Sequence, residues 1–389
     1  KSYDRSVMWN YWGYLYFSDE DYDQAMYAYE QLLKEPDATV PLRTASLLTL
    51  AQLNLVKENW DKGIRLILQW MDEVENVTAQ SYYLLSSAYF QKEDFVKARS
   101  NMETAIRLAE EEGYRPKENW YVLLAACFSE LKDRKIIGAA YALEQQLGIY
   151  EILVNYYPKK MYFLQLAGTY QQMDREEDYM ITLKAAHGKD LLDKEGEYLA
   201  LAQLLLIKKN PYWAAQVLVS GQQKKVTIKD EDTGEEEVIP VLKDTEKNLK
   251  LLADSWRMAQ EIDKAIPVLE KAAKMSKDGD TYVLLGNLYL FEDRMKDSIR
   301  AIEAGLKKAK VKSRSQAQLV LGQAHFELQN FEEAKKQFRL AARDDNKRIK
   351  KTANSWIKYA ENEEIRVKNL ALRRDFIQQS KAKTKAKNS

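Results

Sequence analysis

Few side chains in this 389-residue sequence could take part in catalysis or bind a metal ion. It contains two histidines, His187 and His325, and one cysteine, Cys127, and these residues form no cluster with the spacing of metal ligands. No glycine-rich loop follows an apolar strand, and no serine or cysteine lies in a recognisable nucleophile turn. The sequence therefore predicts no metal site, no cofactor and no catalytic residue.

The remaining candidates for chemistry are runs of carboxylates, at residues 110–112 and 235–237. Neighbouring carboxylates can serve as an acid and a base, but in a chain with 31% charged residues such runs are typical of solvated helix faces. His325 occupies a position that holds Tyr289 in the preceding repeat, which predicts a packed histidine. Cys127 lies in an apolar helical run, which predicts a small buried side chain. We therefore expect a protein without enzymatic activity.

A repeat in the sequence predicts the helices on which His325 and Cys127 lie. The pair Leu285-Gly286 is followed by Ser298, and the same frame returns 36 residues later as Leu321-Gly322. Small residues at positions 286 and 298 allow two helices to cross at about 8 to 10 Å. Self-similarity near a period of 34 residues is typical of stacked helical hairpins, and only 14 Gly and 7 Pro interrupt the chain.

This frame predicts an all-α fold, a right-handed superhelical solenoid of about nine helical hairpins with a capping helix. We expect the solenoid to span residues 1–345, with an insertion at 222–245, the capping helix at 346–379 and a basic disordered tail at 380–389. The frame pairs of the nine repeats are Trp12-Gly13, Leu50-Ala51, Leu85-Ser86, Leu124-Ala125, Leu166-Ala167, Leu201-Ala202, Leu252-Ala253, Leu285-Gly286 and Leu321-Gly322.

The insertion at 222–245 carries β-branched residues on both sides of a glycine turn. Val226 and Ile228 precede the segment Asp232-Thr-Gly-Glu, and Val238 and Val241 follow it. This pattern is typical of a small β-hairpin, although an acidic flexible loop would also fit the composition. Because insertions in repeat proteins lie on one face of the solenoid, the segment is a possible second contact surface.

The C-terminal segment is strongly basic, since residues 346–389 hold 13 Lys or Arg against 4 Asp or Glu. A solvated capping helix with a frayed end accounts for this charge, and attraction to nucleic acid or to a membrane surface is the alternative. No nucleic-acid module accompanies the charge, so we expect no nucleic-acid partner. The longest apolar run, Leu199 to Ile207, is too short to span a bilayer.

The repeat frame resembles that of the tetratricopeptide repeat family. The resemblance implies a protein-binding groove lined mainly by the first helix of each repeat. The residues at groove positions are Asn10, Tyr14 and Phe17 in repeat one, Tyr83, Ser87 and Phe90 in repeat three, and Lys250, Asp254 and Arg257 in repeat seven. The paired Lys and Asn with which some members clamp a chaperone tail are missing, which argues against a co-chaperone role.

Three stretches resemble more closely the tetratricopeptide proteins encoded with bacterial TonB systems. They are Tyr157–Gly168, Asn210–Leu218, and Phe331–Phe338 followed by Ser355–Tyr359. The resemblance implies a periplasmic scaffold for iron-siderophore uptake, with TonB, ExbB or ExbD as partners and an export signal upstream of Lys1. A helical-repeat adaptor for another envelope assembly, in polysaccharide export or outer-membrane protein assembly, is the alternative.

Overall fold

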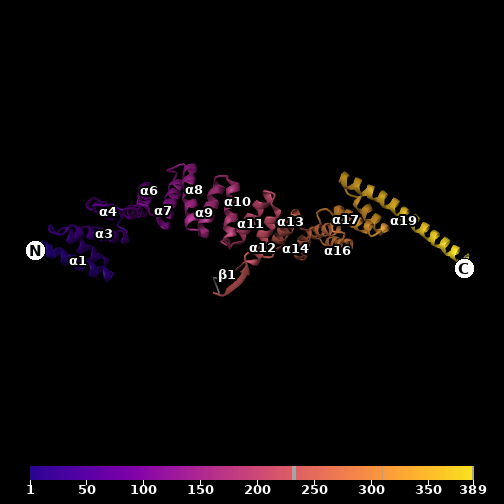
Figure 1. Cartoon of the computed structure of the whole chain (residues 1–389), viewed down its shortest axis with the longest axis horizontal. Helices are drawn as coiled ribbons and strands as arrows, with labels where there is room; N and C mark the ends of the chain where they lie inside the picture. Colours follow the sequence, from indigo (N-terminus) through magenta and orange to yellow (C-terminus); the bar gives the residue numbers. More distant parts are fainter. Residues whose placement is uncertain (230–233, 309, 388–389) are drawn as a thin grey trace. The chain divides into compact units, whose positions relative to one another are not determined.

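The structure, a computed structural model, describes residues 1–229, 234–308 and 310–387, with side chains described as far as residue 381 (Figure 1). Its contacts divide the chain into two compact units, Lys1–Leu191 and Leu192–Ser389. Within each unit, a helix packs mainly against the helices that precede and follow it in the chain. Each unit is therefore a stack of helical hairpins, in which the first helix of a hairpin is helix A and the second is helix B.

The first unit holds five hairpins. In chain order their helices are α1 (Ser2–Ser18), α2 (Tyr22–Leu33), α3 (Val40–Val56), α4 (Trp60–Glu73), α5 (Ala79–Gln91), α6 (Phe95–Glu111), α7 (Glu118–Asp133), α8 (Ala139–Tyr156), α9 (Lys160–Gln172) and α10 (Glu176–Gly188).

The second unit holds four hairpins and one further helix. These are α11 (Glu195–Ile207), α12 (Pro211–Gln223), α13 (Glu246–Met258), α14 (Ile262–Met275), α15 (Asp280–Phe291), α16 (Met295–Leu306), α17 (Arg314–Glu327), α18 (Phe331–Ala341) and α19 (Lys347–Lys387). The described residues thus contain the nine hairpins that the repeat frame predicts. The chain is an all-α repeat solenoid.

Small residues lie where helix A crosses helix B, as the frame predicts. In the hairpin of α15 and α16, the Ser298 hydroxyl donates a 2.7 Å hydrogen bond to the Gly286 carbonyl oxygen. A Cβ atom at Gly286 would lie 3.2 Å from the Ser298 carbonyl oxygen and would overlap the side chain of Ile302. The close approach therefore requires glycine on α15.

Eight of the nine turns within hairpins share one backbone conformation in the described chain. The residue two positions before helix B has a positive φ of 55 to 65°. The amide of the following residue donates to the carbonyl five residues earlier, as from Asn210 to Leu205 at 2.8 Å, which closes the end of helix A. The positive-φ residues are Glu20, Glu58, Glu93, Asp174, Lys209, Gln260, Asp293 and Gln329.

The insertion at 222–245 forms a β-hairpin, one of the two structures that the sequence allowed. Strands β1 (Lys225–Lys229) and β2 (Glu236–Pro240) pair antiparallel, with Thr227 opposite Val238. The base of the β-hairpin is attached to the solenoid, because the amide of Leu242 donates a 2.9 Å hydrogen bond to the Gly221 carbonyl oxygen and the Leu242 side chain is fully buried. Part of the predicted turn, Asp232 and the residue after it, lies outside the described residues.

Helix α19 packs on the last hairpin through its first half. Ala353 and Ala360 are fully buried, and the Trp356 ring stacks on Phe338 with 5.5 Å between centroids. Farther along the helix, the side chains of Ile365 and Leu370 are exposed. Beyond Ala360, Glu364 still pairs with Lys335 of α18, and Val367 is half-buried.

The predicted end of the capping helix at residue 379 is wrong. Helix α19 continues to Lys387, so residues 380–387, assigned from sequence to a disordered tail, are helical. Lys and Ala have high helix propensity, and no Gly or Pro follows residue 379 to end the helix. Residues 388–389 lie outside the described part of the chain.

Candidate protein-binding surface

Helix α1 presents two of its three predicted groove residues to solvent. The Tyr14 side chain is 61% exposed, and Phe17 is exposed with its ring 6.1 Å from that of Tyr22. Asn10, one turn before Tyr14, is half-buried. These residues are four and three positions apart, so they share one face of the helix. Tyr14 and Phe17 are therefore free to contact a partner.

Helix α5 uses two of its predicted groove residues for packing, Tyr83 against the next repeat and Phe90 within its own hairpin. The Tyr83 ring stacks on Trp120 of α7 with 5.5 Å between centroids, and its hydroxyl oxygen accepts a 2.9 Å hydrogen bond from Asn119. Phe90 contacts Phe95 edge to face at 5.1 Å, and Ser87 is half-buried. Truncating Tyr83 or Phe90 would therefore act first on stability.

Helix α13 carries the charged group that the sequence singled out. Arg257 donates two hydrogen bonds to Asp254, at 3.1 and 3.2 Å, and Lys250 lies 3.8 Å from Glu246. All these groups are partly exposed, and ion pairs of this kind contribute about 0 to 1 kcal/mol to stability. Their arrangement on an open helix face suits contact with another molecule better than it suits stabilisation.

A groove of about 680 Å³ opens beside Arg257, within the second unit. The end of α13 and the start of α14 form one wall, and α15 forms the other with Leu284, Asn287 and Phe291. Phe291 is 76% exposed. Asp263 and Glu292, which also line the groove, add negative charge to it. The groove therefore offers an apolar anchor point together with groups of both charges.

Sequence reasoning missed Phe291 and Leu284. Phe291 is the last residue of α15 and precedes a polar turn, and a large apolar residue at such a position is a signal that could have drawn attention to it. The repeat frame draws attention only to residues that recur, and this phenylalanine has no aromatic counterpart in the following repeat. Only the packing of α13, α14 and α15 shows that Phe291 shares a groove with Arg257.

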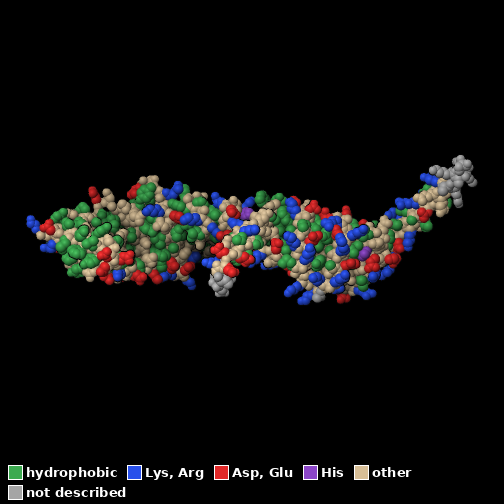
Figure 2. Space-filling model, turned by 90° about the horizontal axis from the view of Figure 1, so that it is seen from below, with side chains coloured by type: hydrophobic (Ala, Val, Ile, Leu, Met, Phe, Trp, Pro, Cys, Tyr) green, Lys and Arg blue, Asp and Glu red, His purple; other side chains and the backbone are tan. Residues whose placement is uncertain are grey.

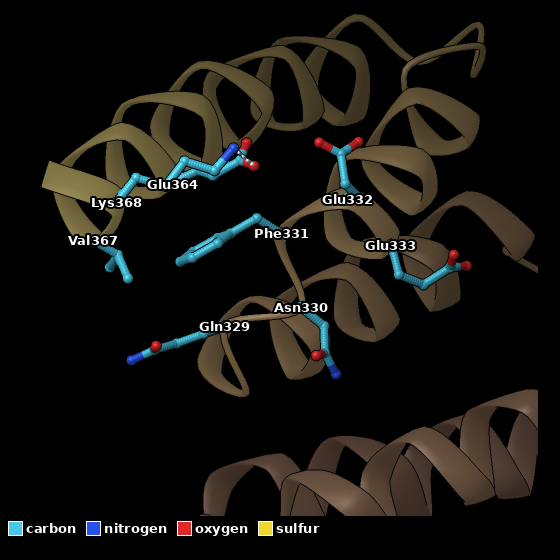
Figure 3. Close-up of a pocket in the computed structure, with 8 residues that line it drawn as sticks. All are labelled: Gln329, Asn330, Phe331, Glu332, Glu333, Glu364, Val367 and Lys368. Carbon is cyan, nitrogen blue, oxygen red and sulfur yellow. Dashed lines mark ion pairs between the residues drawn. The ribbon is translucent and has the colours of Figure 1, made fainter. Parts of the chain in front are cut away.

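A second cavity of about 600 Å³ lies between α18 and α19 (Figure 3). Glu364, Val367 and Lys368 come from α19, and the other lining residues come from the start of α18 and the turn before it. Lys335 is buried nearby and pairs with Glu332 and Glu364, both at 2.7 Å. The hydrogen bond from Lys335 to Glu364, and then that from Lys368, lowers the pKa of Glu364 to about 2. The cavity is best explained as the junction that attaches α19.

Cys127 and His325, two of the residues singled out for chemistry, lie in packed surroundings, whereas the carboxylate runs at 110–112 and 235–237 are exposed. Cys127 is fully buried, and burial raises the pKa of its thiol to about 12, so the reactive thiolate is suppressed. Burial lowers the pKa of His325, whose Nδ1 atom lies in the packed interior. Among the described residues, no group of three or more His, Cys, Asp or Glu could hold a metal ion.

None of the helices described is both long enough and apolar enough to cross a membrane.

Five of the predicted groove residues fall into two sets according to their exposure. Tyr14, Phe17 and Arg257 are open to solvent, whereas Tyr83 and Phe90 are packed between helices. The first two lie in one unit and Arg257 lies in the other. The arrangement can bind another chain through aromatic and guanidinium side chains.

Comparison with known families identifies two regions as tetratricopeptide repeats. One match covers residues 79–112, which hold α5 and α6, and the other covers residues 283–348, from α15 to the start of α19. The chain therefore contains tetratricopeptide repeats, and proteins of this kind serve as scaffolds for protein interactions. No match is found among curated proteins.

Several solved structures are similar to parts of the chain. A MamA protein is 18% identical, with a TM-score of 0.38 over 48% of this chain and 92% of that one. A tetratricopeptide repeat protein from Parabacteroides merdae is 14% identical, with a TM-score of 0.29 over 73% of this chain and 98% of that one. A chain of the APC/C hetero-tetramer Cut9-Hcn1 is 12% identical, with a TM-score of 0.31 over 92% of this chain and 83% of that one.

Proposed function

We propose that this tetratricopeptide-repeat chain is a non-enzymatic scaffold that binds protein partners of a TonB system for iron-siderophore uptake, in the periplasm. The observation that carries the scaffold role is the set of exposed aromatic and guanidinium side chains on helix A surfaces, namely Tyr14, Phe17 and Arg257 with Phe291. Tyr, Trp and Arg anchors dominate interface energetics. The TonB assignment is supported by the resemblance of Tyr157–Gly168 and Asn210–Leu218 to proteins of such systems.

The binding surface can be tested by single alanine substitutions at Tyr14, Phe17, Arg257 and Phe291. We expect at least one to weaken capture of the periplasmic segments of TonB, ExbB or ExbD by about thirtyfold, the effect of losing about 2 kcal/mol from a central anchor. The thermal unfolding midpoint should change little, because these side chains are 42 to 76% exposed. Capture is measured by surface plasmon resonance and unfolding by circular dichroism.

Tyr83→Ala is the matched control for this series. Tyr83 is also a helix A aromatic, but its ring stacks on Trp120, so its truncation should lower the unfolding midpoint. If every stably folded variant keeps wild-type capture, the helix A surface is not the contact, and the β-hairpin of β1 and β2 becomes the surface to test. If none of the three partners is captured by the wild type, the adaptor for another envelope assembly becomes the better function.

The proposed compartment is tested separately, by fractionating cells that express the complete gene. We expect a cleaved precursor and recovery from the periplasm, since TonB, ExbB and ExbD segments in that compartment are the proposed partners. Recovery from the cytosol alone, without a cleaved precursor, would contradict the TonB role and leave the protein-binding role intact.

A further inference from the structure

The β-hairpin of β1 and β2 projects from the end of α12 as a two-stranded ribbon (Figure 1). Charged side chains of both signs lie around it on the face shown in Figure 2. Among the described residues, the extensive contacts of β1 are with β2, and β2 also packs against α12. A ribbon of two strands is at best marginally stable in water, and a third strand or a packed face normally stabilises it. The outer edge of β1 is therefore a place where a further strand could be added.

The pairing of the two strands determines which backbone groups point away from the ribbon. The Val241 amide donates a 2.8 Å hydrogen bond to the Lys224 carbonyl oxygen. Hydrogen-bonded and non-hydrogen-bonded pairs alternate along an antiparallel ladder, so the pair of Thr227 and Val238 is a non-hydrogen-bonded one. The N–H and C=O groups of both residues therefore point outward, as do those of every second residue on either strand.

The two outer edges differ in what they offer another strand. On the β1 edge the outward groups belong to Lys225, Thr227 and Lys229, which are all exposed and all carry an N–H group. None of these backbone groups is bonded outside the ribbon among the described residues. The β2 edge includes Pro240 at an outward position, and proline has no N–H to donate and blocks strand addition. The β1 edge is therefore the open one.

The side chains along β1 indicate the sequence that a third strand should have. Lys225, Thr227 and Lys229 alternate with Val226 and Ile228, so the two sets lie on opposite faces of the ribbon. Side chains of a neighbouring strand, about 4.8 Å away, would lie directly beside them. Acidic side chains beside the lysines and β-branched ones beside Val226 and Ile228 would stabilise the pairing. The edge therefore fits an extended segment in which acidic and apolar residues alternate.

A second copy of this chain fits the β1 edge less well. Two β1 strands related by a twofold axis at Thr227 would place Lys225 of one copy beside Lys229 of the other, and like charges directly opposite each other are destabilising. Within the ribbon Lys229 lies opposite Glu236, whereas Lys225 lies opposite Pro240 and so faces no charge there. The positive charge at the base of β1 therefore favours a partner strand of the opposite sign.

We propose that the outer edge of β1 is a docking site for an extended segment of a protein partner, in which acidic and β-branched residues alternate. The segment adds to the hairpin as an antiparallel third strand. Backbone groups of Lys225, Thr227 and Lys229 hold it through main-chain hydrogen bonds, and the two lysine side chains select its charge. The site goes beyond the proposed function, because it shares no residue with the helix A surfaces.

Fluorescence anisotropy with chain 1–389 and a labelled peptide tests the proposal. The probe is Gly-Ser-Glu-Val-Thr-Val-Glu-Ser-Gly, and in the basic probe both glutamates are lysines. The wild type should bind the acidic probe about tenfold more tightly than the basic one. Thr227→Pro should weaken binding of the acidic probe by about tenfold, because it removes an outward N–H without breaking the ladder. Val238→Pro makes the same change on the residue directly opposite and should stay within about twofold of the wild type.

A second variant, with both Lys225→Glu and Lys229→Glu, keeps the backbone edge and reverses its charge. It should bind the basic probe more tightly than the acidic one. A wild type that binds neither probe at about 300 μM of the chain overturns the proposal. Equal effects of the two proline variants overturn it as well, and so does a double variant that still prefers the acidic probe. Capture by the helix A surfaces is measured with other variants, so failure here leaves the proposed function standing.

Discussion

Glycine at a helix crossing and glycine on an open helix surface have opposite effects on stability. At Gly286 an added Cβ atom would overlap Ile302, whereas at Gly168 in α9 nothing lies within 4 Å. The tetratricopeptide frame explains the difference, because position 286 faces helix B. The same amino acid is therefore a packing requirement in α15 and a helix-weakening residue in α9.

We predict that Gly286→Ala lowers the free energy of unfolding by roughly 1 to 3 kcal/mol, because overpacking forces the hairpin apart. Gly168→Ala is the control and should raise it by up to about 1 kcal/mol, through its higher helix propensity. Urea denaturation followed by circular dichroism measures both. Equal effects of the two substitutions would contradict the crossing geometry.

The turn residues with positive φ offer a second test at the residue scale. Lys209 has a φ of 57°, and a side chain in this left-handed region costs about 1 kcal/mol, which glycine avoids. We predict that Lys209→Gly raises the free energy of unfolding by about 0.5 kcal/mol, after the entropic cost of glycine is subtracted. Gln203→Gly, on the exposed side of α11 in the same hairpin, should lower it by about 0.5 to 1 kcal/mol. A destabilising Lys209→Gly would show that the turn is not strained.

Among the elements, α19 depends most clearly on charge. The hydrogen bond from buried Lys335, and then that from Lys368, lowers the pKa of Glu364 from its ordinary value of 4.5 to about 2. A carboxylate with a lowered pKa stabilises the folded state above the unfolded pKa and loses this contribution as pH falls through the folded pKa. The attachment of α19 should therefore weaken between about pH 4.5 and 2.

We predict that acidification across this range increases amide hydrogen exchange at residues 347–364 before it does so in α13 and α14. Glu364→Gln should remove that pH dependence, because the titrating group is gone, and should leave α19 less protected already at pH 7. The control is Glu363→Gln, because the Glu363 carboxylate accepts hydrogen bonds from Arg366 on the same helix. An unchanged exchange profile of Glu364→Gln at both pH values would refute the role of this pair.

At the scale of the whole molecule, contacts are short-range along the chain. Among the described residues, the helix pairs with the most extensive contacts are adjacent in sequence, and the smaller contacts of α5 with α7, α15 with α17 and α17 with α19 join helices two positions apart. Stability in such proteins is close to a sum of repeat and nearest-neighbour terms. We predict that Gly286→Ala increases hydrogen exchange in residues 246–345 and leaves residues 1–191 unchanged. A uniform rise in exchange across both units would show instead that the chain unfolds as one cooperative body.

The repeat frame was enough to predict the nine hairpins, and the local pattern at 222–245 left a β-hairpin and an acidic flexible loop open, of which the structure shows the hairpin. These features depend on the periodicity and the type of residues, and both can be read directly from the amino-acid sequence. The crossing glycine at position 286 was predictable for the same reason, because a small residue recurs wherever two helices approach. The left-handed turn residues were not, since Glu, Asp, Lys and Gln occupy positions where glycine is the usual signal.

Only the tertiary structure decided what each exposed aromatic does. Tyr14 and Tyr83 each belong to a set of three predicted groove residues on the first helix of a repeat. In the structure Tyr14 is exposed to solvent, whereas Tyr83 stacks on Trp120 of the next hairpin. The groove of Arg257 and Phe291 was equally hidden. A side chain is buried when a surface from another repeat packs against it. The sequence of one helix does not show which surface that is, so it does not determine the burial of its side chains.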